Sequence, residues 1–247
     1  MTDITQHALQ ALAESKIKTV YLIGRRGPLQ AAFTIKELRE MLKLKNCDTV
    51  WKPRDFEGIA QHVPKLARPK KRIIELMLKS LEEEKKAGCT NEFRPVFYRS
   101  PLEIIGKHKV EGVMLGVNRL EGEDVLKQTA VLTDVKESIK CDLAVSSIGY
   151  KSIQVEDCIP FDSRNGIVKN NNGKVDEGVY TCGWLGTGPT GVILTTMGNA
   201  FGVADMILHD IEVEGLDKVE KSGYAEILKV LQEKNVQIVS WRDWEKN

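Results

Sequence analysis

The sequence predicts an α/β fold, and two observations support that prediction. First, an apolar, β-branched run at residues 19–23 ends at Gly24 and is followed by a helix-forming stretch at residues 31–44. Second, two further apolar runs, at residues 142–148 and 179–182, also end in glycine. Short strands that alternate with helices are typical of a sheet whose strands are largely parallel. We therefore expect a layered α/β protein.

The first part of the chain gives the clearest signals for individual elements. Residues 4–15 carry apolar side chains at helical spacing, and residues 19–23 have the continuous apolar character of a short buried strand. Residues 31–44 have one apolar stripe and are rich in helix formers. A second helix is expected from about residue 70 to residue 86, because its apolar residues recur at helical spacing and Pro69 suits a first turn.

From Phe93 onward the pattern changes to strands and then to loops. Strands are expected at residues 95–98, 110–117, 129–133 and 143–148. The Gly and Asn residues between them favour an antiparallel excursion. Beyond Tyr150 the chain is polar until a strand at residues 179–184, and a long helix is expected at residues 189–210. We place a domain boundary at the change, which gives domains 1–149 and 150–247.

The composition is that of an ordinary soluble globular protein. The chain has 247 residues, a formal net charge of +1, 42% hydrophobic residues and 29% charged residues. These values argue against a disordered chain and against a strongly basic nucleic-acid binder. Five cysteines without a CxxC pair predict buried free thiols in a reducing compartment. No apolar run approaches the roughly 20 residues that span a bilayer, and no cleavable signal or targeting segment is visible.

The strongest local feature is the sequence GRRGPLQ at residues 24–30, directly after the first strand. In a parallel sheet, ligands bind beyond the carboxyl ends of the strands. The guanidinium groups of Arg25 and Arg26 are planar forks suited to phosphate, and arginine here favours the extra phosphate of NADP. A solvated basic turn explains the same residues equally well.

The second feature is a glycine-rich stretch at residues 182–193, with glycines at positions 183, 186, 188 and 191. Glycine lets a backbone approach a ligand closely, and free amides at the start of the following helix can bind an anion or a flavin carbonyl. Trp184 could stack on a flat ring. Composition alone favours the alternative, in which this side chain packs in the core.

The third feature is a basic run at residues 65–72, with five Lys or Arg residues and no acidic one. Such a run is usually a solvated face. If it has a function, its unbroken positive charge suits an acidic protein partner better than nucleic acid, since no aromatic residues interleave with it. The four histidines are scattered, so no metal site is expected, and no hydrolase motif is present. No strand with a GxGxxG fingerprint precedes the helix expected at residues 4–15, which predicts that a first βα unit is not part of this chain.

The di-arginine segment also carries a resemblance to a known family. Residues 24–41 are similar to the adrenodoxin reductase family, the mitochondrial-type ferredoxin–NADP reductases. The resemblance continues, in register, through residues 67–69, 93–95, 146–152, 183–184, 188–193 and 243–246. It spans nearly the whole chain, and the GRRGP string is far more specific than a lone glycine motif.

The resemblance implies a fold and an activity. The expected fold is a doubly wound, Rossmann-like NADP-binding domain, incomplete, at residues 1–149, with the C-terminal part of an FAD-binding domain at residues 150–247. The expected activity is that of a mitochondrial flavoprotein oxidoreductase: a hydride passes from NADPH to FAD, and single electrons then pass to an acidic [2Fe–2S] ferredoxin. The cofactors carry this chemistry, so no catalytic side chain is expected. The resemblance implies a location in the mitochondrial matrix and allows a peripheral membrane association.

The resemblance also implies site residues. It assigns Arg25 and Arg26 to the 2′-phosphate of NADP, with Glu37 as a further NADP contact. The expected FAD contacts are Trp184, Gly191, Val192 and Ile193. The expected ferredoxin-docking residues are Arg39, Arg68 and Arg72.

Two classes of function remain open from the sequence. One is an NADPH:ferredoxin oxidoreductase that is poorly active as this chain alone, because the glycine fingerprints for the pyrophosphates of both cofactors are missing from it. The other is a non-catalytic binding module that keeps the ferredoxin-docking face and a partial NADP site.

Overall fold

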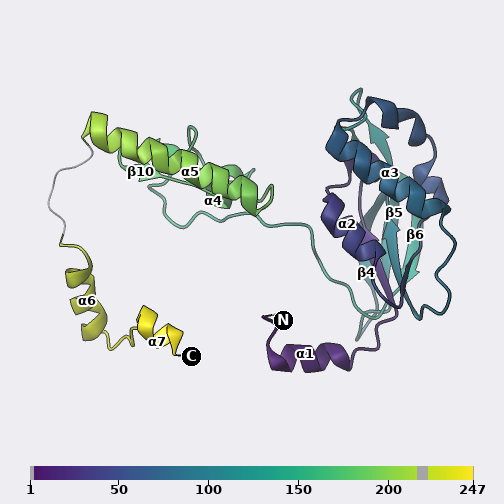
Figure 1. Ribbon diagram of the computed structural model, residues 1–247, viewed down its shortest axis with the longest axis horizontal. Coiled ribbons are helices and arrows are strands. Elements are labelled where there is room, and N and C mark those ends of the chain that lie inside the picture. Colours follow the sequence, from purple (N-terminus) through teal and green to yellow (C-terminus); the bar gives the residue numbers. More distant parts are fainter. Residues whose placement is uncertain (1–2, 216–221, 247) are drawn as a thin grey trace. The chain divides into compact units, whose positions relative to one another are not determined.

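The computed structural model describes residues 3–215 and 222–246, and it mixes helices with parallel and antiparallel sheets (Figure 1). The chain divides into a first unit, residues 1–146, and a second unit, residues 147–247. The predicted α/β class is therefore confirmed. The first described helix, α1 (Gln6–Ala13), has no buried residue.

A three-stranded parallel sheet organises the first unit. Its strands are β1 (Thr19–Ile23), β2 (Cys47–Thr49) and β3 (Asn91–Val96), in the order β1-β3-β2. Residue Ile23 at the end of β1 pairs with Val96 at the end of β3, so the carboxyl ends of these two strands meet at one edge. The strand predicted at residues 19–23 is confirmed, but its burial is not, because Val20 and Leu22 are exposed.

Two helices pack against each other in this unit, α2 (Ile35–Leu42) and α3 (Arg68–Glu82). Both helices lie on the same side of the strands of the first unit (Figure 1). The predicted helix start at residue 31 is wrong, because Thr34 caps α2 and Glu37 completes the capping box. Short 3₁₀ turns connect the elements: η1 (Pro28–Gln30), η2 (Pro53–Phe56) and η3 (Ala60–Lys65).

The core of the first unit joins these helices to an aromatic cluster. Ile74 and Met77 of α3 are fully buried, and Leu38 of α2 is buried with 3% exposure. Trp51 and Phe97 stack with their ring centres 6.5 Å apart, and Phe56 meets both rings edge-on. Offset and edge-on aromatic pairs add stability beyond the area that they bury.

The antiparallel excursion expected after residue 95 is confirmed. Strands β4 (Arg99–Ile105), β5 (Gly112–Glu121) and β6 (Thr129–Lys140) form a meander in the order β4-β5-β6. The register between β5 and β6 shifts between Gly116 and Asn118. Such an irregularity bends a strand and changes where the next side chain points.

The strand predicted at residues 143–148 is wrong. The structure assigns no strand there, and Val145 and Ile148 are 76% and 92% exposed. A β-strand is stabilised by pairing and by packing on its faces, and among the described residues none pairs with this run. An apolar sequence alone was therefore not enough to form the element.

The second unit combines small sheets with longer helices. Its strands pair antiparallel, β7 (Phe161–Asp162) with β8 (Ile167–Val168) and β9 (Lys174–Asp176) with β10 (Val179–Tyr180). Its helices are α4 (Trp184–Thr187), α5 (Ile193–His209), the π-helical turn η4 (Asp210–Glu214), α6 (Tyr224–Glu233) and α7 (Trp241–Glu245). The predicted start of α5 at residue 189 is too early, because Gly191 has a φ of 82°.

The five cysteines are free, as expected, but none is buried. Cys158 and Cys182 are exposed, and the other three are half-buried. Among residues 3–215 and 222–246, no helix is long and apolar enough to cross a membrane, and no cluster of three His, Cys, Asp or Glu side chains could hold a metal ion.

Candidate functional site

The di-arginine turn, residues 24–27, lies at the carboxyl end of β1. Arg25 and Arg26 are both exposed, whereas the following residues 27–30 are buried. Pro28 is among the most completely buried side chains of the chain. The turn therefore combines a buried, fixed base with two guanidinium groups that reach solvent.

Hydrogen bonds from neighbouring strands fix the backbone of the turn. At its start, Gly24 N–H donates to Val96 (2.8 Å) at the end of β3. Each of the next three carbonyl oxygens accepts one bond: Gly24 from Arg99 N–H (3.0 Å), Arg25 from the Asn118 side-chain amide (2.8 Å) and Arg26 from Tyr98 N–H (3.1 Å). The backbone is thus held from β3, from the segment after it and from β5.

Side chains close the other end of the turn. Gly27 N–H donates to the Gln30 side-chain oxygen (3.0 Å), and the Gln30 side-chain nitrogen donates to the carbonyl of Val125. Lys70, from α3, donates to the carbonyl of Ala31 (2.5 Å). Burial lowers the pKa of Lys70, and the positive charge of Arg26 lowers it further. A third cationic side chain therefore acts on the di-arginine turn.

A polar network anchors the segment that holds the turn. The Asp55 carboxylate accepts from Phe97 N–H (3.0 Å), and burial raises the pKa of Asp55 against that bond. The buried Arg99 donates from Nε to Glu137 (2.6 Å) and from Nη1 to the carbonyl of Phe97 (3.2 Å). The hydrogen bond from Arg99 lowers the pKa of Glu137. The segment 97–99 is therefore fixed on both sides.

Tyr98 lies in an unusual conformation within that segment. Its φ is 57°, in the left-handed region that a bulky residue rarely adopts. Its phenol ring lies so close to Gly27 that a Cβ at that glycine would overlap it. The hydrogen bonds of segment 97–99 and the space left by Gly27 allow Tyr98 to keep this conformation. Backbone strain of this kind is common at functional sites.

Glu37 has a structural partner as well as an exposed position. Its carboxylate accepts from Thr34 N–H (2.9 Å), and its own N–H donates to the Thr34 hydroxyl (3.2 Å). The backbone bond from Thr34 lowers the pKa of Glu37. The side chain therefore holds the first turn of α2, which is a reason for a glutamate at this position that does not involve a ligand.

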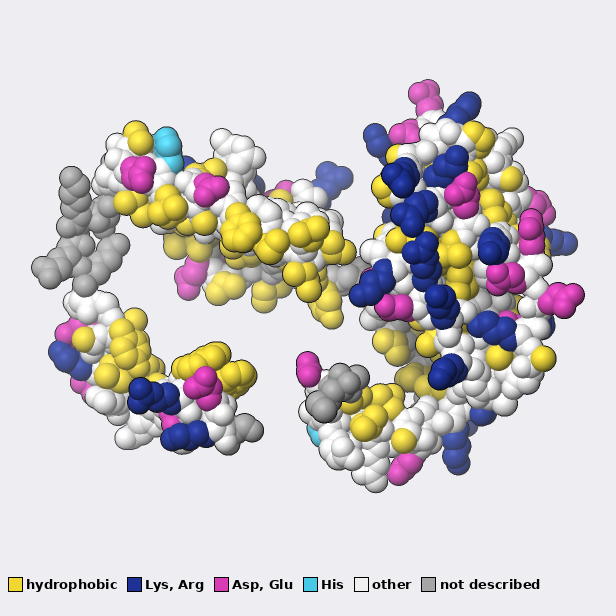
Figure 2. Space-filling model, viewed as in Figure 1, with side chains coloured by type: hydrophobic (Ala, Val, Ile, Leu, Met, Phe, Trp, Pro, Cys, Tyr) yellow, Lys and Arg dark blue, Asp and Glu magenta, His cyan; other side chains and the backbone are white. Residues whose placement is uncertain are grey.

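A second surface, the α2–α3 face, gathers the predicted docking residues. Arg39 lies on α2, and Arg68 and Arg72 lie one helical turn apart on α3; all three are exposed. Figure 2 shows Lys and Arg side chains concentrated on the face that carries these helices. None of the three arginines forms an ion pair with a described residue. Their charges are therefore available to a partner.

In the second unit, the glycine-rich stretch leaves apolar groups open to solvent. Trp184 is 49% exposed, so the core-packing alternative does not hold. Its ring stacks on Tyr150, with ring centres 6.5 Å apart. Gly191 has a φ of 82°, and Val192 and Ile193, which begin α5, are exposed. No side chain caps the start of α5, so its first amides remain available.

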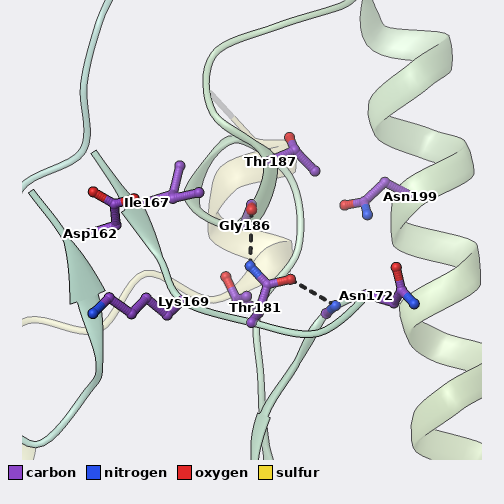
Figure 3. Close-up of a pocket in the computed structure, with 10 residues that line it drawn as sticks. Asp162, Ile167, Lys169, Asn172, Thr181, Gly186, Thr187 and Asn199 are labelled. Carbon is purple, nitrogen blue, oxygen red and sulfur yellow. Dashed lines mark hydrogen bonds between the residues drawn. The ribbon is translucent and has the colours of Figure 1, made fainter. Parts of the chain in front are cut away.

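A cavity of about 460 Å³ lies on another side of the same stretch (Figure 3). Its lining residues are Asp162, Ile167, Lys169, Asn170, Asn172, Gly173, Thr181, Gly186, Thr187 and Asn199. The Asn170 side chain ties three segments together, by donating to the carbonyls of Val168 (2.8 Å) and Gly186 (3.0 Å) and accepting from Gly173 N–H (2.9 Å). Sequence reasoning did not identify this cavity.

Sequence reasoning also missed three residues around the di-arginine turn: Tyr98, Asn118 and Lys70. Tyr98 could have been found, because it follows β3, whose carboxyl end meets that of β1. Asn118 is 93 residues from Arg25 and gives no local signal. Lys70 lies within the basic run, which was considered only as a surface.

No protein-family model matches the chain. Among curated proteins, the mitochondrial NADPH:adrenodoxin oxidoreductase of Drosophila melanogaster is 45% identical over 99% of this chain. The protein of that name from Homo sapiens is 42% identical over 99% of this chain. Over 99% of its length the chain is therefore similar to members of the adrenodoxin reductase family. The resemblance expected from the di-arginine segment is therefore confirmed.

Similarity to this family extends to bacterial relatives. NADPH-ferredoxin reductase FprA of Mycobacterium leprae is 34% identical over 99% of the chain. The solved structure of Mycobacterium tuberculosis FprA in complex with NADPH covers 98% of the chain, with a TM-score of 0.84 and 32% identity. The chain spans about half the length of these adrenodoxin reductase relatives, 51% of the fly protein and 55% of the FprA chain.

Proposed function

We propose that the di-arginine turn binds the 2′-phosphate of NADP(H). The observation that carries this proposal is the combination of two exposed guanidinium groups with a backbone whose three carbonyl oxygens are all hydrogen-bonded. Planar arginine forks on a fixed backbone suit a dianionic phosphate, which accepts several charge-assisted hydrogen bonds. The NADPH named for the relatives supports the same ligand.

Glu37 is proposed as a further contact of the same nucleotide. Its carboxylate is exposed and lies in the first turn of α2. A carboxylate can accept from ribose or amide groups while it still caps a helix, because it has two oxygens. This role would use the oxygen that does not accept from Thr34.

The glycine-rich stretch of the second unit is proposed to hold part of FAD. The half-exposed ring of Trp184, the open conformation at Gly191 and the uncapped start of α5 at Val192 and Ile193 fit a flat ring with polar edges. Apolar side chains would cover the ring face, and backbone amides would meet its carbonyls. When bound, FAD would supply the conversion between two-electron and one-electron transfer.

The α2–α3 face is proposed to dock an acidic [2Fe–2S] ferredoxin through Arg39, Arg68 and Arg72. Their exposure and their lack of partners among the described residues support this role. Complementary charge raises the rate of association more than it raises affinity. Together with the NADP and FAD sites, this surface supports the function of an NADPH:ferredoxin oxidoreductase. A mitochondrial location is proposed from the names of the animal relatives. We also propose that the two units correspond to the NADP- and FAD-binding parts.

Nucleotide binding by the double variant Arg25→Ala/Arg26→Ala tests the central proposal. Each charge-assisted hydrogen bond contributes about 1.5–3 kcal/mol, so losing one from each arginine should weaken NADP⁺ binding by roughly 100-fold or more, measured by calorimetry. The affinity for NAD⁺ should change little, because it lacks the 2′-phosphate. Arg164→Ala, in the second unit, is the matched control. Equal losses for both nucleotides would contradict the proposal.

Activity separates the reductase from a non-catalytic binding module. The purified chain is assayed for oxidation of NADPH by an artificial electron acceptor, with and without added FAD, and its flavin absorbance is recorded after gel filtration. FAD-dependent turnover supports the reductase. NADP⁺ binding without turnover or flavin absorbance supports the binding module.

A further inference from the structure

We infer that Asn118 is a positioning residue for the di-arginine turn, and that it sets how well the site distinguishes a ribose 2′-phosphate from a 2′-hydroxyl. This inference rests on the proposed NADP-binding function and goes beyond it. Asn118 lies on β5, outside every segment that the sequence linked to a nucleotide. It acts through the backbone of Arg25 and needs no contact with the ligand.

Among the described residues, Asn118 supplies the side-chain donor to the carbonyl oxygens of residues 24–26. The carbonyls of Gly24 and Arg26 accept from backbone amides, whereas the carbonyl of Arg25 accepts from the side chain of Asn118 (2.8 Å). The side chain is itself well fixed, because Asn118 is 6% exposed and also pairs with the Ser100 hydroxyl (2.9 Å). Loss of this donor would leave the carbonyl of Arg25 without its hydrogen bond from β5 and so loosen the turn.

The fold directs this side chain toward the turn. The register of β5 against β6 shifts between Gly116 and Asn118. At this irregularity the Thr133 hydroxyl donates to the carbonyl of Val117 (2.8 Å). A bulge of this kind re-aims a side chain. Here the residue directly after the shift is the one whose amide reaches Arg25.

The backbone of Asn118 supports the second arginine as well. Its N–H donates to the carbonyl of Tyr98 (2.8 Å), and Tyr98 N–H in turn donates to the carbonyl of Arg26 (3.1 Å). One residue of β5 therefore holds Arg25 directly and Arg26 through one intermediate. Because Tyr98 is strained, with a φ of 57°, this support has to be maintained by its neighbours.

The consequence for recognition follows from the geometry of bidentate binding. Two guanidinium forks grip one phosphate well only while the distance and angle between their Cα atoms stay fixed. In a looser turn both arginines stay charged and exposed, but they must be ordered when the phosphate binds. This ordering costs conformational entropy and so weakens binding. Affinity for a 2′-phosphate should therefore fall, whereas affinity for the rest of the nucleotide should not.

The test compares 2′,5′-ADP with 5′-AMP, two probes that differ only in the 2′-phosphate. Calorimetric titration of the full chain with Asn118→Ala should show a 5- to 10-fold weaker binding of 2′,5′-ADP and unchanged binding of 5′-AMP. Asn118→Leu, which fills the space without a donor, should behave in the same way and covers the case in which the alanine variant does not fold. Asn46→Ala, whose amide pairs with Thr90 elsewhere in the unit, is the control.

A ligand-free measurement gives a second readout. Hydrogen exchange at the amides of residues 24–27 should be faster in Asn118→Leu than in the wild type, with the α3 amides unchanged. The inference would be overturned if either Asn118 variant bound 2′,5′-ADP as tightly as the wild type, or if both probes lost affinity equally. In that case Arg25→Ala/Arg26→Ala would still show the selective loss, so the proposed function would stand. If neither the wild type nor any variant binds 2′,5′-ADP, the proposed function and the inference fail together.

Discussion

The phenol ring of Tyr98 lies directly against Gly27, so that a side chain at position 27 has no space. The two residues belong to the turns that follow β3 and β1, and the parallel pairing of these strands brings the turns together. Gly27 has a φ of −89°, so its backbone does not require glycine. Close approach, and not conformation, requires glycine here.

Gly27→Ala should therefore destabilise the first unit by steric overlap. We expect a loss of about 1–3 kcal/mol in the free energy of unfolding, as for other overpacked sites, measured by urea denaturation. Gly24→Ala is the matched control, because a Cβ at Gly24 meets no atom within 4 Å. Adding Tyr98→Gly to Gly27→Ala should recover part of the loss. A Gly27→Ala variant as stable as Gly24→Ala would contradict the packing described here.

Glu137→Gln should change how stability depends on pH. The pKa of Glu137 is lowered in the folded state by the bond from Arg99, so its contribution is present above the unfolded pKa of about 4.3 and is lost as the pH falls through the folded pKa. At pH 7 the variant should lose about 1–2 kcal/mol, a value reduced from that of a fully buried pair because the carboxylate is partly exposed.

The measurement is the free energy of unfolding between pH 3 and pH 7. The wild type should lose more stability than Glu137→Gln as the pH falls below about 5, and the two curves should converge at the acid end. Glu103→Gln, at an exposed position on β4, is the control. Parallel curves for Glu137→Gln and the wild type would show that the ion pair with Arg99 contributes nothing.

Charge reversal on the α2–α3 face should weaken binding to an acidic [2Fe–2S] ferredoxin. For Arg68→Glu/Arg72→Glu we expect a dissociation constant on the order of 100-fold higher at low salt, because like charges then face each other. The difference should shrink as salt is raised, since screening shortens the range of the interaction. Surface plasmon resonance over a salt series measures both effects.

The control for that experiment carries the same change in net charge at a different place. Lys107→Glu/Lys127→Glu alters exposed residues in the two connections of the β4-β5-β6 meander. Ferredoxin binding by this pair should stay within a few-fold of the wild type. If both pairs weaken binding equally, net charge and not the α2–α3 face determines association.

Asn170→Ala should destabilise the second unit locally. The variant removes three hydrogen bonds and leaves Gly173 N–H without its acceptor, which should cost about 2 kcal/mol. Hydrogen exchange should become faster at Val168, Gly173 and Gly186 and stay unchanged in the first unit. Asn171→Ala, at an exposed neighbouring position, serves as the control. Uniform acceleration across the chain would mean that Asn170 has no local role.

The parts of the fold that the sequence predicted depend on local signals. The strand at residues 19–23 and the turn after it were predicted because β-branched residues, glycine and helix formers occur in direct succession. The predicted start of α2 is wrong, since the helix begins after a capping box at Thr34 that a count of helix formers overlooks. The antiparallel meander was predicted from the Gly and Asn residues between its strands.

The remainder depends on contacts between distant residues. The apolar run at residues 143–148 has the composition of a strand but pairs with no strand in the described part of the chain, and β structure depends on such pairing. Asn118 became visible only through its bond to Arg25, and Trp184 only through its exposure and its stacking on Tyr150. Neither the bond between Asn118 and Arg25 nor the stacking of Trp184 on Tyr150 can be read from a local sequence pattern.

The exposed run at residues 143–148 has a practical consequence for handling the protein. Unpaired backbone groups beside Val145 and Ile148 offer a template for intermolecular β-pairing. A net charge of +1 supplies almost no colloidal repulsion against it near neutral pH. At the concentrations that calorimetry needs, this short stretch should nucleate self-association, so Val145→Lys should raise the solubility limit that light scattering detects.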